Sequence, residues 1–220
     1  MVKLGDTFPN FFIKTTVGEM YLNDWIGDSW AILFSHPADF TPVCTTELAR
    51  LVQLHEEFSK RNCKLIALSC DSKETHLKWL NDIKVYAGTL QEGFPYPIID
   101  DENRDIAIEL QMIDPDEKDA QGLPLTARAV FIIDPKKKMR LSILYPATTG
   151  RSFEEVLRVL DSLQLCDKHK VATPEGWKNG DDVMVQPSVS AEELKSSFPS
   201  LTIVQLPSGK QYIRKVPQPN

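Results

Sequence analysis

The chain has 220 residues, of which 42% are hydrophobic and 25% are charged, and its formal net charge is −6. This balance is that of a globular protein and excludes disorder as the main state. The acidic excess leaves no broad basic surface for a phosphate backbone, so we expect no nucleic-acid partner.

The first residues, MVKLGDTFPNFF, lack the basic head and apolar core of a secretory signal. No stretch approaches the roughly 18 apolar residues that cross a bilayer, so we expect no membrane span. The simplest location is the cytoplasm, where a reducing environment would keep cysteines as free thiols. The spacing of the cysteines matches no zinc pattern, so we expect no metal site. The four cysteines are Cys44, Cys63, Cys70 and Cys166.

The first clear pattern is a strand, a helix and a second strand. Residues 30–34 and 64–69 are continuous apolar runs, each short enough for a buried strand. Between them, apolar residues recur at helical spacing from 48 to 58. Thr41 is a capping residue type, and Pro42 after it is typical of a first helical turn. We therefore predict a βαβ unit with a right-handed crossover.

The elements beyond Cys70 are predicted in the same way, from periodicity and turn signals. A second long helix is expected to open at Asp71 or Ser72. The further predicted elements are a strand at 97–99, a helix at 103–110, a loop at 114–126, a hairpin of strands at 129–133 and 141–145, and an amphipathic helix at 153–163.

The composition changes near residue 167, beyond which prolines and turn signals are frequent and apolar runs are short. We therefore divide the chain into a domain of residues 1–166 and an extension of residues 167–220. The extension is small and polar, so we expect it to pack on the main domain or on another subunit. Its predicted elements are a short helix with a capping box of Ser190 and Glu193, and strand-like pieces at 201–206 and 210–216.

Chemistry is suggested by the segment HPADFTPVC, in which a strand ends and a helix opens with Cys44 in its first turn. The first backbone N–H groups of a helix lack internal partners, and the helix dipole is positive there. Both effects favour a thiolate over a thiol. The plain alternative is that Cys44 is a small buried hydrophobic residue, as free cysteines often are.

Two matches identify the chain as similar to a known family. Pro37, Thr41 and Cys44 form the string P-x-x-x-T-x-x-C, within the longer match DFTPVCTTE. Arg128 stands in LTARAVFIID, at the start of a predicted strand. These residues resemble the active-site signature of the peroxiredoxins, and the 1-Cys subfamily is the most similar. The resemblance covers nearly the whole chain, including SILYPATTGRSFEE and the extension.

The resemblance implies a fold and an activity. The fold class is α/β, a thioredoxin-like three-layer sandwich with a small C-terminal α+β extension, and the assembly is a homodimer. The activity is a thiol-dependent peroxidase that reduces hydrogen peroxide and organic hydroperoxides in antioxidant defence and redox homeostasis. Because sulfur carries the chemistry, no metal or organic cofactor is expected.

The resemblance also implies a role for each matching residue. Cys44 is the peroxidatic nucleophile, which passes through a sulfenic acid. Arg128 holds the thiolate and polarises the peroxide, and the Thr41 hydroxyl hydrogen-bonds the peroxide oxygens. Pro37 shields the site from water, and Glu47 fixes the arginine fork. These roles are physically reasonable, because the negative charge that develops as the peroxide bond breaks needs hydrogen-bond donors that are already in place.

Other histidines and cysteines have weaker signals. His36 precedes the motif proline, where 1-Cys members have histidine, and it either tunes the site or serves packing. His55 and His76 fall within predicted helices and are interpreted as structural. Cys63 and Cys70 bracket a predicted buried strand and are also interpreted as structural.

No obligate resolving cysteine is expected. Two-cysteine relatives carry one within V-C-P in the C-terminal arm, and the matching stretch here places Ala172 at that position. Cys166 is close by and is the one candidate that could act instead. The resemblance therefore implies an external thiol reductant, either glutathione or a thioredoxin-like protein.

The sequence also bears on two other functions. A redox-regulated chaperone or thiol relay protein is compatible with the sequence, because large peroxiredoxin assemblies can act in this way. A dithiol oxidoreductase on the same fold needs C-x-x-C at the helix start, and here Cys44 is followed by Thr45, Thr46 and Glu47.

Some 1-Cys peroxiredoxins also carry a phospholipase site with a serine in G-D-S-W-G. This chain keeps Ser29 in GDSWA, but the position of the histidine base holds Asn23. The aspartate position falls on Lys136, with Asp134 two residues earlier. A serine without a base is a poor nucleophile, so we expect no appreciable phospholipase activity.

Overall fold

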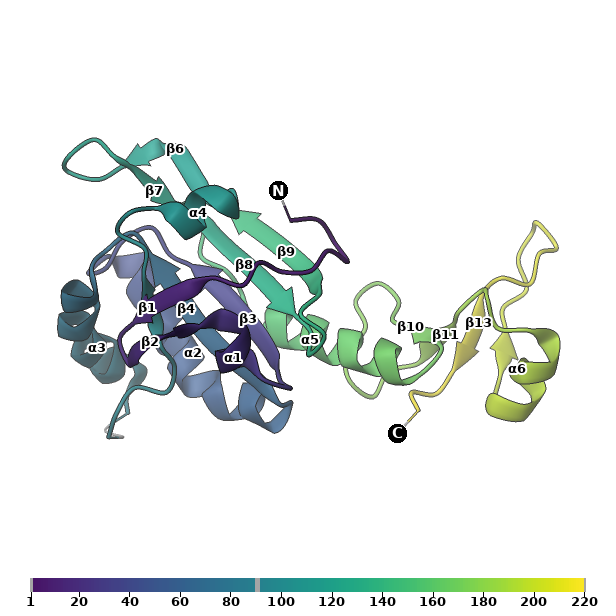
Figure 1. Cartoon of the computed structure of the whole chain (residues 1–220). Helices are drawn as coiled ribbons and strands as arrows, with labels where there is room; N and C mark the ends of the chain where they lie inside the picture. Colours follow the sequence, from purple (N-terminus) through teal and green to yellow (C-terminus); the bar gives the residue numbers. More distant parts are fainter. Residues whose placement is uncertain (1, 90–91, 220) are drawn as a thin grey trace. The chain divides into compact units, whose positions relative to one another are not determined.

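The computed structural model describes residues 2–89 and 92–219 and forms two compact units, residues 1–153 and 154–220 (Figure 1). Both units combine helices and strands, and the first contains a large sheet. The α/β class and the extra C-terminal sheet predicted from the sequence are confirmed. The division after residue 166 stays a prediction; the compact units separate after residue 153.

Seven strands form the sheet of the first unit, in the order β2-β1-β5-β4-β3-β8-β9. In the middle, β3 pairs in parallel with β4, and β4 with β5, which confirms the predicted βαβ arrangement. β8 pairs antiparallel with β3 and β9. The bounds are β1 Phe12–Thr15, β2 Gly18–Tyr21, β3 Trp30–Ser35, β4 Cys63–Ser69, β5 Ile98–Asp100, β8 Arg128–Ile133 and β9 Met139–Tyr145.

The central strands β3 and β8 are mostly apolar because both faces of the sheet are covered. Every residue of β3 and β8 is buried. Successive side chains point to opposite faces. Ala31 and Leu33 lie in a core cluster with residues of α1 (Leu22–Ile26) and α4 (Asp105–Glu109), whereas the Phe34 ring contacts Tyr96 and Phe153.

Two long helices cover part of the sheet (Figure 1). Helix α2 (Pro42–Lys60) packs on β4 and on α3 (Lys73–Ala87). Ser72 caps α3, because its hydroxyl oxygen accepts a hydrogen bond from the Thr75 backbone N–H, and Gly88 ends the helix in a left-handed conformation. Both helices confirm the sequence-based prediction. No helix in the described residues is long and apolar enough to cross a membrane.

The predicted loop at 114–126 is wrong: this segment forms a two-stranded hairpin of β6 (Ile113–Lys118) and β7 (Pro124–Thr126). Asp119 makes the turn, since its carboxylate accepts hydrogen bonds from the backbone N–H groups of Gln121 and Leu123. Most side chains of the hairpin are at least partly exposed, so no alternation of apolar and polar residues marks the strands.

The second unit contains most of α5 (Phe153–Lys168), the helix α6 (Ala191–Ser197) and a four-stranded sheet. Ser190 caps α6, as predicted, by accepting a hydrogen bond from the Glu193 N–H. The predicted strand-like pieces are confirmed as shorter strands. The sheet has the order β10-β11-β13-β12, with bounds Val171–Ala172, Val183–Val185, Arg214–Val216 and Thr202–Ile203. A small core of its own includes buried Trp177, Val183 and Val185.

Candidate active site

Cys44 is the third residue of α2 and is fully buried. Pro42 opens the helix, and Thr41 at the N-cap position has an extended backbone. The Thr41 side chain does not cap the helix, contrary to the reading of Thr41 as a side-chain cap. Its hydroxyl instead donates to the Ala38 carbonyl at 2.9 Å, within the loop that leads into the helix. The helix start therefore keeps free N–H groups beside Cys44.

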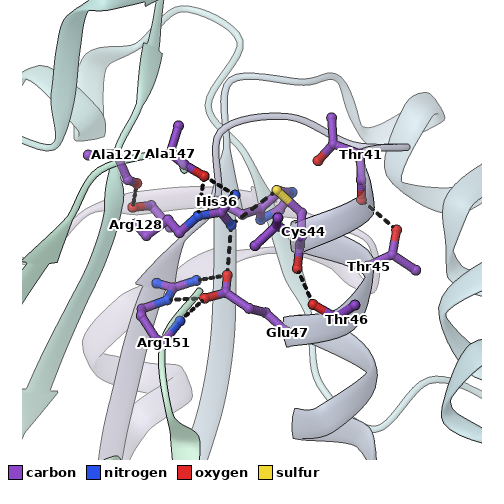
Figure 2. Close-up of polar contacts among 12 residues, drawn as sticks. His36, Thr41, Cys44, Thr45, Thr46, Glu47, Ala127, Arg128, Ala147 and Arg151 are labelled. Atoms are coloured by element: carbon purple, nitrogen blue, oxygen red, sulfur yellow. Dashed lines mark hydrogen bonds and ion pairs between the residues drawn. The ribbon is translucent and has the colours of Figure 1, made fainter. Parts of the chain in front are cut away.

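Arg128 is the first residue of β8, and it brings a cation to the Cys44 thiol. Its Nη1 atom lies 3.4 Å from the Cys44 sulfur (Figure 2). Nε and Nη2 both donate to the Ala147 carbonyl, at 2.9 and 2.6 Å. Only 3% of Arg128 is exposed, so solvent screens this charge weakly. The predicted juxtaposition of Cys44 and Arg128 is present in the structure.

Glu47 lies one helical turn after Cys44 and joins two arginines. Its Oε2 atom accepts from Arg128 Nη1 at 2.8 Å and from Arg151 Nη2 at 2.7 Å. Its Oε1 atom accepts from the backbone N–H and the Nε of Arg151, at 2.6 and 2.9 Å (Figure 2). Burial alone would raise the pKa of Glu47, but these hydrogen bonds and the two positive charges lower it below its usual range.

The buried charges of this cluster bear on the state of Cys44. Arg128 and Arg151 each carry a positive charge, and Glu47 supplies one negative charge. A Cys44 thiolate makes the cluster electrically neutral, which low-dielectric surroundings favour. Sequence reasoning missed Arg151, although it stands in the quoted segment TTGRSFEE. No local pattern marks it, because its partner Glu47 is 104 residues away.

The remaining predicted residues lie in and beside the loop before α2. Pro37 is buried, as its expected shielding role requires. His36 follows β3 and is also fully buried. Its Nε2 atom lies 2.8 Å from the Asp39 carboxylate, which also contacts His76, a contact that sequence reasoning did not predict.

Comparison with known proteins decides the family. The AhpC/TSA family model matches residues 4–142, and the model for the C-terminal domain of 1-Cys peroxiredoxin matches residues 162–200. The chain is 60% identical to peroxiredoxin-6 of Bos taurus over 218 residues, which cover 98% of this chain and 97% of that protein.

The chain belongs to the 1-Cys peroxiredoxins.

Solved structures of other 1-Cys peroxiredoxins support this family assignment. A cysteine-to-serine variant of peroxiredoxin 6 of Arenicola marina superposes with a TM-score of 0.98 at 56% identity, covering all of both chains. A yeast mitochondrial 1-Cys peroxiredoxin gives a TM-score of 0.87 at 44% identity, covering 99% of this chain and 100% of that one. This peroxiredoxin thus has the thioredoxin-like fold of its family and is a thiol-dependent peroxidase.

The other cysteines of this peroxiredoxin have different surroundings. Cys44, Cys63, Cys70 and Cys166 form no disulfide in the part of the chain that the structure describes. Burial raises the pKa of the Cys63 thiol far above its usual range, and burial raises that of Cys70 to about 12. Both stay protonated and hence poorly nucleophilic at neutral pH, which agrees with their structural interpretation. Cys166 lies on α5 and is partly exposed.

Ser29, the serine of the GDSWA segment, is buried in this peroxiredoxin. The Ser29 hydroxyl donates to the side-chain carbonyl of Asn62 at 3.0 Å. The Asp134 carboxylate accepts from the Lys138 backbone N–H and from Arg140. An amide carbonyl cannot take up the serine proton, so the contact made by Ser29 supplies no general base.

Proposed function

We propose that Cys44 is the peroxidatic cysteine and that this protein reduces hydrogen peroxide and organic hydroperoxides. The observation that carries the proposal is the 3.4 Å contact between Arg128 Nη1 and the sulfur of Cys44, at the start of a helix. A guanidinium and free backbone N–H groups both stabilise a thiolate. The thiolate is the reactive form of cysteine.

In the proposed reaction, the thiolate attacks one oxygen of the hydroperoxide. A sulfur–oxygen bond forms while the oxygen–oxygen bond breaks, so the sulfur is oxidised by two electrons to a sulfenic acid. Hydroxide or alkoxide leaves and takes up a proton from water. The negative charge moves from sulfur to the leaving oxygen, and donors already fixed beside that path lower the barrier.

Each residue around Cys44 has a proposed part in this step. Arg128 has its Nη1 directed at the sulfur and can also polarise the peroxide. The Thr41 hydroxyl, whose own proton is donated to the Ala38 carbonyl, hydrogen-bonds the peroxide by accepting from its O–H group. Buried Pro37 keeps water away, and Glu47 fixes the direction of the Arg128 fork.

An open pocket of about 630 Å³ borders Thr41 and supports organic hydroperoxides as substrates, although Cys44 and Arg128 are not among its lining residues. Its walls are largely aromatic and aliphatic, so it suits an apolar substituent on the peroxide. The principal apolar lining residues are Phe40, Pro42, Trp79, Val85 and Tyr86.

The reductant proposed for the sulfenic acid is an external thiol, glutathione or a thioredoxin-like protein. The yeast mitochondrial 1-Cys relative resolves its thiol through glutathione and thioredoxin systems. In this chain Cys63 and Cys70 are buried, and burial keeps both protonated. Neither is therefore suited to attack the sulfenic acid.

We further propose a homodimer in the cytoplasm. Strand β9 is an edge of the seven-stranded sheet, and Leu144 on it is 63% exposed. Unpaired edge strands readily pair with another chain, and a twofold axis would pair β9 with its own copy. Sedimentation should show a dimer for the wild type and a monomer for Leu144→Glu. The absence of disulfides among the described cysteines supports a reducing compartment.

The test of the catalytic proposal is oxidation by one equivalent of hydrogen peroxide in the presence of dimedone. Mass spectrometry should find one dimedone adduct, on Cys44, and the Cys44→Ser variant should neither form it nor turn over peroxide. Cys63→Ser is the matched control and should keep the Cys44 adduct. Peroxide turnover by Cys44→Ser at the wild-type rate would overturn the proposal.

A further inference from the structure

A chain of three buried side chains links the loop before α2 to α3. His36 Nε2 lies 2.8 Å from Asp39 Oδ1, and His76 Nδ1 lies 2.6 Å from Asp39 Oδ2. His76 Nε2 lies 3.1 Å from the Ile99 carbonyl on β5. The side chains of all three residues are completely inaccessible to solvent.

The distances from the Asp39 carboxylate to His36 and His76 are those of hydrogen bonds and are too short for two ligands of one metal ion. Donor atoms bound to one tetrahedral zinc at about 2.0 Å stand about 3.3 Å apart, because each bond points to a different corner. The two contacts of Asp39 are shorter, 2.6 and 2.8 Å, and have the length of charge-assisted hydrogen bonds. The three residues therefore form a hydrogen-bonded chain.

The direction of each bond follows from the acceptors. A carbonyl oxygen only accepts, so His76 Nε2 carries a proton toward Ile99. Burial would raise the pKa of Asp39, but hydrogen bonds and charge from His36 and His76 lower it below its usual range. The carboxylate is therefore ionised, and both of its neighbours donate. His76 thus donates from both ring nitrogens, from Nδ1 to Asp39 and from Nε2 to the Ile99 carbonyl.

The last residue of the hydrogen-bonded group, His36, is held in one tautomer. Its Nε2 donates to Asp39, while its buried Nδ1 has no hydrogen-bond partner among the residues that the structure describes. His36 is one residue beyond β3, and continuing the β3–β8 register places it opposite Arg128. The hydrogen-bonded chain thus ends at the position that faces Arg128 across the sheet.

Asp39 also lies in the middle of the loop that carries Pro37 and Thr41. Its backbone N–H donates to Asp71 Oδ2 at 2.9 Å, and its carboxylate is held from two sides by the histidines. Three elements, β3, α3 and the turn after β4, therefore fix this one loop residue. A loop so held cannot shift Thr41 away from the start of α2 without breaking buried hydrogen bonds.

We propose that Asp39 and His76 are positioning residues of the peroxidase, which hold His36 in one tautomer and the loop 37–41 against the helix start. The proposal rests on the function of Cys44 proposed above. His76 therefore has a role beyond the structural one interpreted from its position in a helix. The hydrogen-bonded side chains act through their fixed geometry, because a misplaced Thr41 or His36 would lower the rate constant for oxidation of Cys44.

Two substitutions of His76 separate this role from simple anchoring of α3. The amide nitrogen of an asparagine can take the place of His76 Nδ1 and keep the bond to Asp39. The amide nitrogen of a glutamine reaches the place of Nε2 and keeps the bond to Ile99. Positioning predicts that His76→Asn retains more activity than His76→Gln, and anchoring to β5 predicts the reverse order.

The measurement is the rate constant for oxidation of Cys44 by hydrogen peroxide, followed by tryptophan fluorescence in a stopped-flow instrument. We expect His76→Gln to slow it about tenfold or more and His76→Asn by less than about threefold, as geometry changes of this size do. His55→Asn is the control, because His55 lies on α2 and does not belong to the hydrogen-bonded group of His36, Asp39 and His76. Its rate constant should match that of the wild type. Equal rates in all variants, or the reverse order, would overturn the proposal.

A second measurement uses the wild-type protein and does not depend on variant folding. Nitrogen-15 NMR of the imidazole rings should show His76 protonated on both nitrogens and His36 on Nε2 alone. Loss of the His36 tautomer preference in Asp39→Asn is also expected. A His76 ring with a bare Nδ1 in the wild type would overturn the proposal. Failure of the catalytic proposal is distinguishable, because it would appear as full activity in Cys44→Ser.

Discussion

Arg128 and Cys44 are 84 residues apart in the chain, yet Arg128 Nη1 lies 3.4 Å from the Cys44 sulfur. The Ala147 carbonyl accepts from two other nitrogens of the same guanidinium, and Glu47 accepts from the nitrogen that faces the sulfur. The position of the cation is therefore set before any peroxide arrives. Preorganisation of this kind is the usual source of electrostatic rate enhancement.

Replacing Arg128 by alanine should slow oxidation of Cys44 by hydrogen peroxide by at least about tenfold, because a buried cation contributes more than a surface pair. Stopped-flow fluorescence measures the rate constant. Arg158→Ala removes an arginine paired with Glu155 in the second unit and serves as the matched control. If Arg128→Ala reacts at the wild-type rate, the 3.4 Å contact has no role in the chemistry.

Replacing Glu47 by glutamine should lower the free energy of unfolding by about 3–5 kcal/mol near pH 7, because two buried arginines lose their anion. The pKa of Glu47 in the folded protein is lowered from its ordinary value of 4.5. The ionised Glu47 therefore makes its full contribution to the free energy of unfolding above about pH 4.5. This contribution is lost as the pH falls through the pKa of Glu47 in the folded protein.

The difference in stability between wild type and Glu47→Gln should accordingly shrink in acid. Urea unfolding at a series of pH values measures it. Glu155→Gln, which disrupts an exposed pair with Arg158, is the control and should change stability by less than about 1 kcal/mol. A difference that grows toward low pH would contradict the assigned direction of the Glu47 pKa.

Replacing Cys166 by serine should leave peroxide turnover with an external thiol unchanged within about twofold, since no internal resolving thiol is expected. Non-reducing gels with peptide mapping check the product of peroxide treatment. A disulfide between Cys44 and Cys166 as the main product would contradict the 1-Cys mechanism. Without a reductant, the sulfenic acid should remain exposed to overoxidation by excess peroxide.

No appreciable release of fatty acid from phosphatidylcholine vesicles is expected at acidic pH. The Ser29 hydroxyl donates to the Asn62 amide carbonyl, and Asn23 stands where the histidine base would be. Loss of a base costs several orders of magnitude in rate. Fatty-acid release that disappears in Ser29→Ala would show that another group serves as the base.

Much of the fold could be predicted because local patterns in this chain agree with tertiary structure. The apolar runs of β3 and β4 and the helical spacing of α2 each point to one element. The hairpin of β6 and β7 could not be found in this way, because its mostly exposed strands bury too few side chains to leave an apolar pattern. Its turn depends on the hydrogen bonds of Asp119.

The active site divides in the same manner. The sequence alone determined that Cys44 stands in the first turn of a helix after a strand, because the signals are contiguous along the chain. Only the tertiary structure decided that Arg151 pairs with Glu47 and that His76 contacts the Asp39 carboxylate. Sheet register and helix packing create these contacts between distant segments, so no local pattern contains them. The burial that gives them their strength exists only once the sheet is covered.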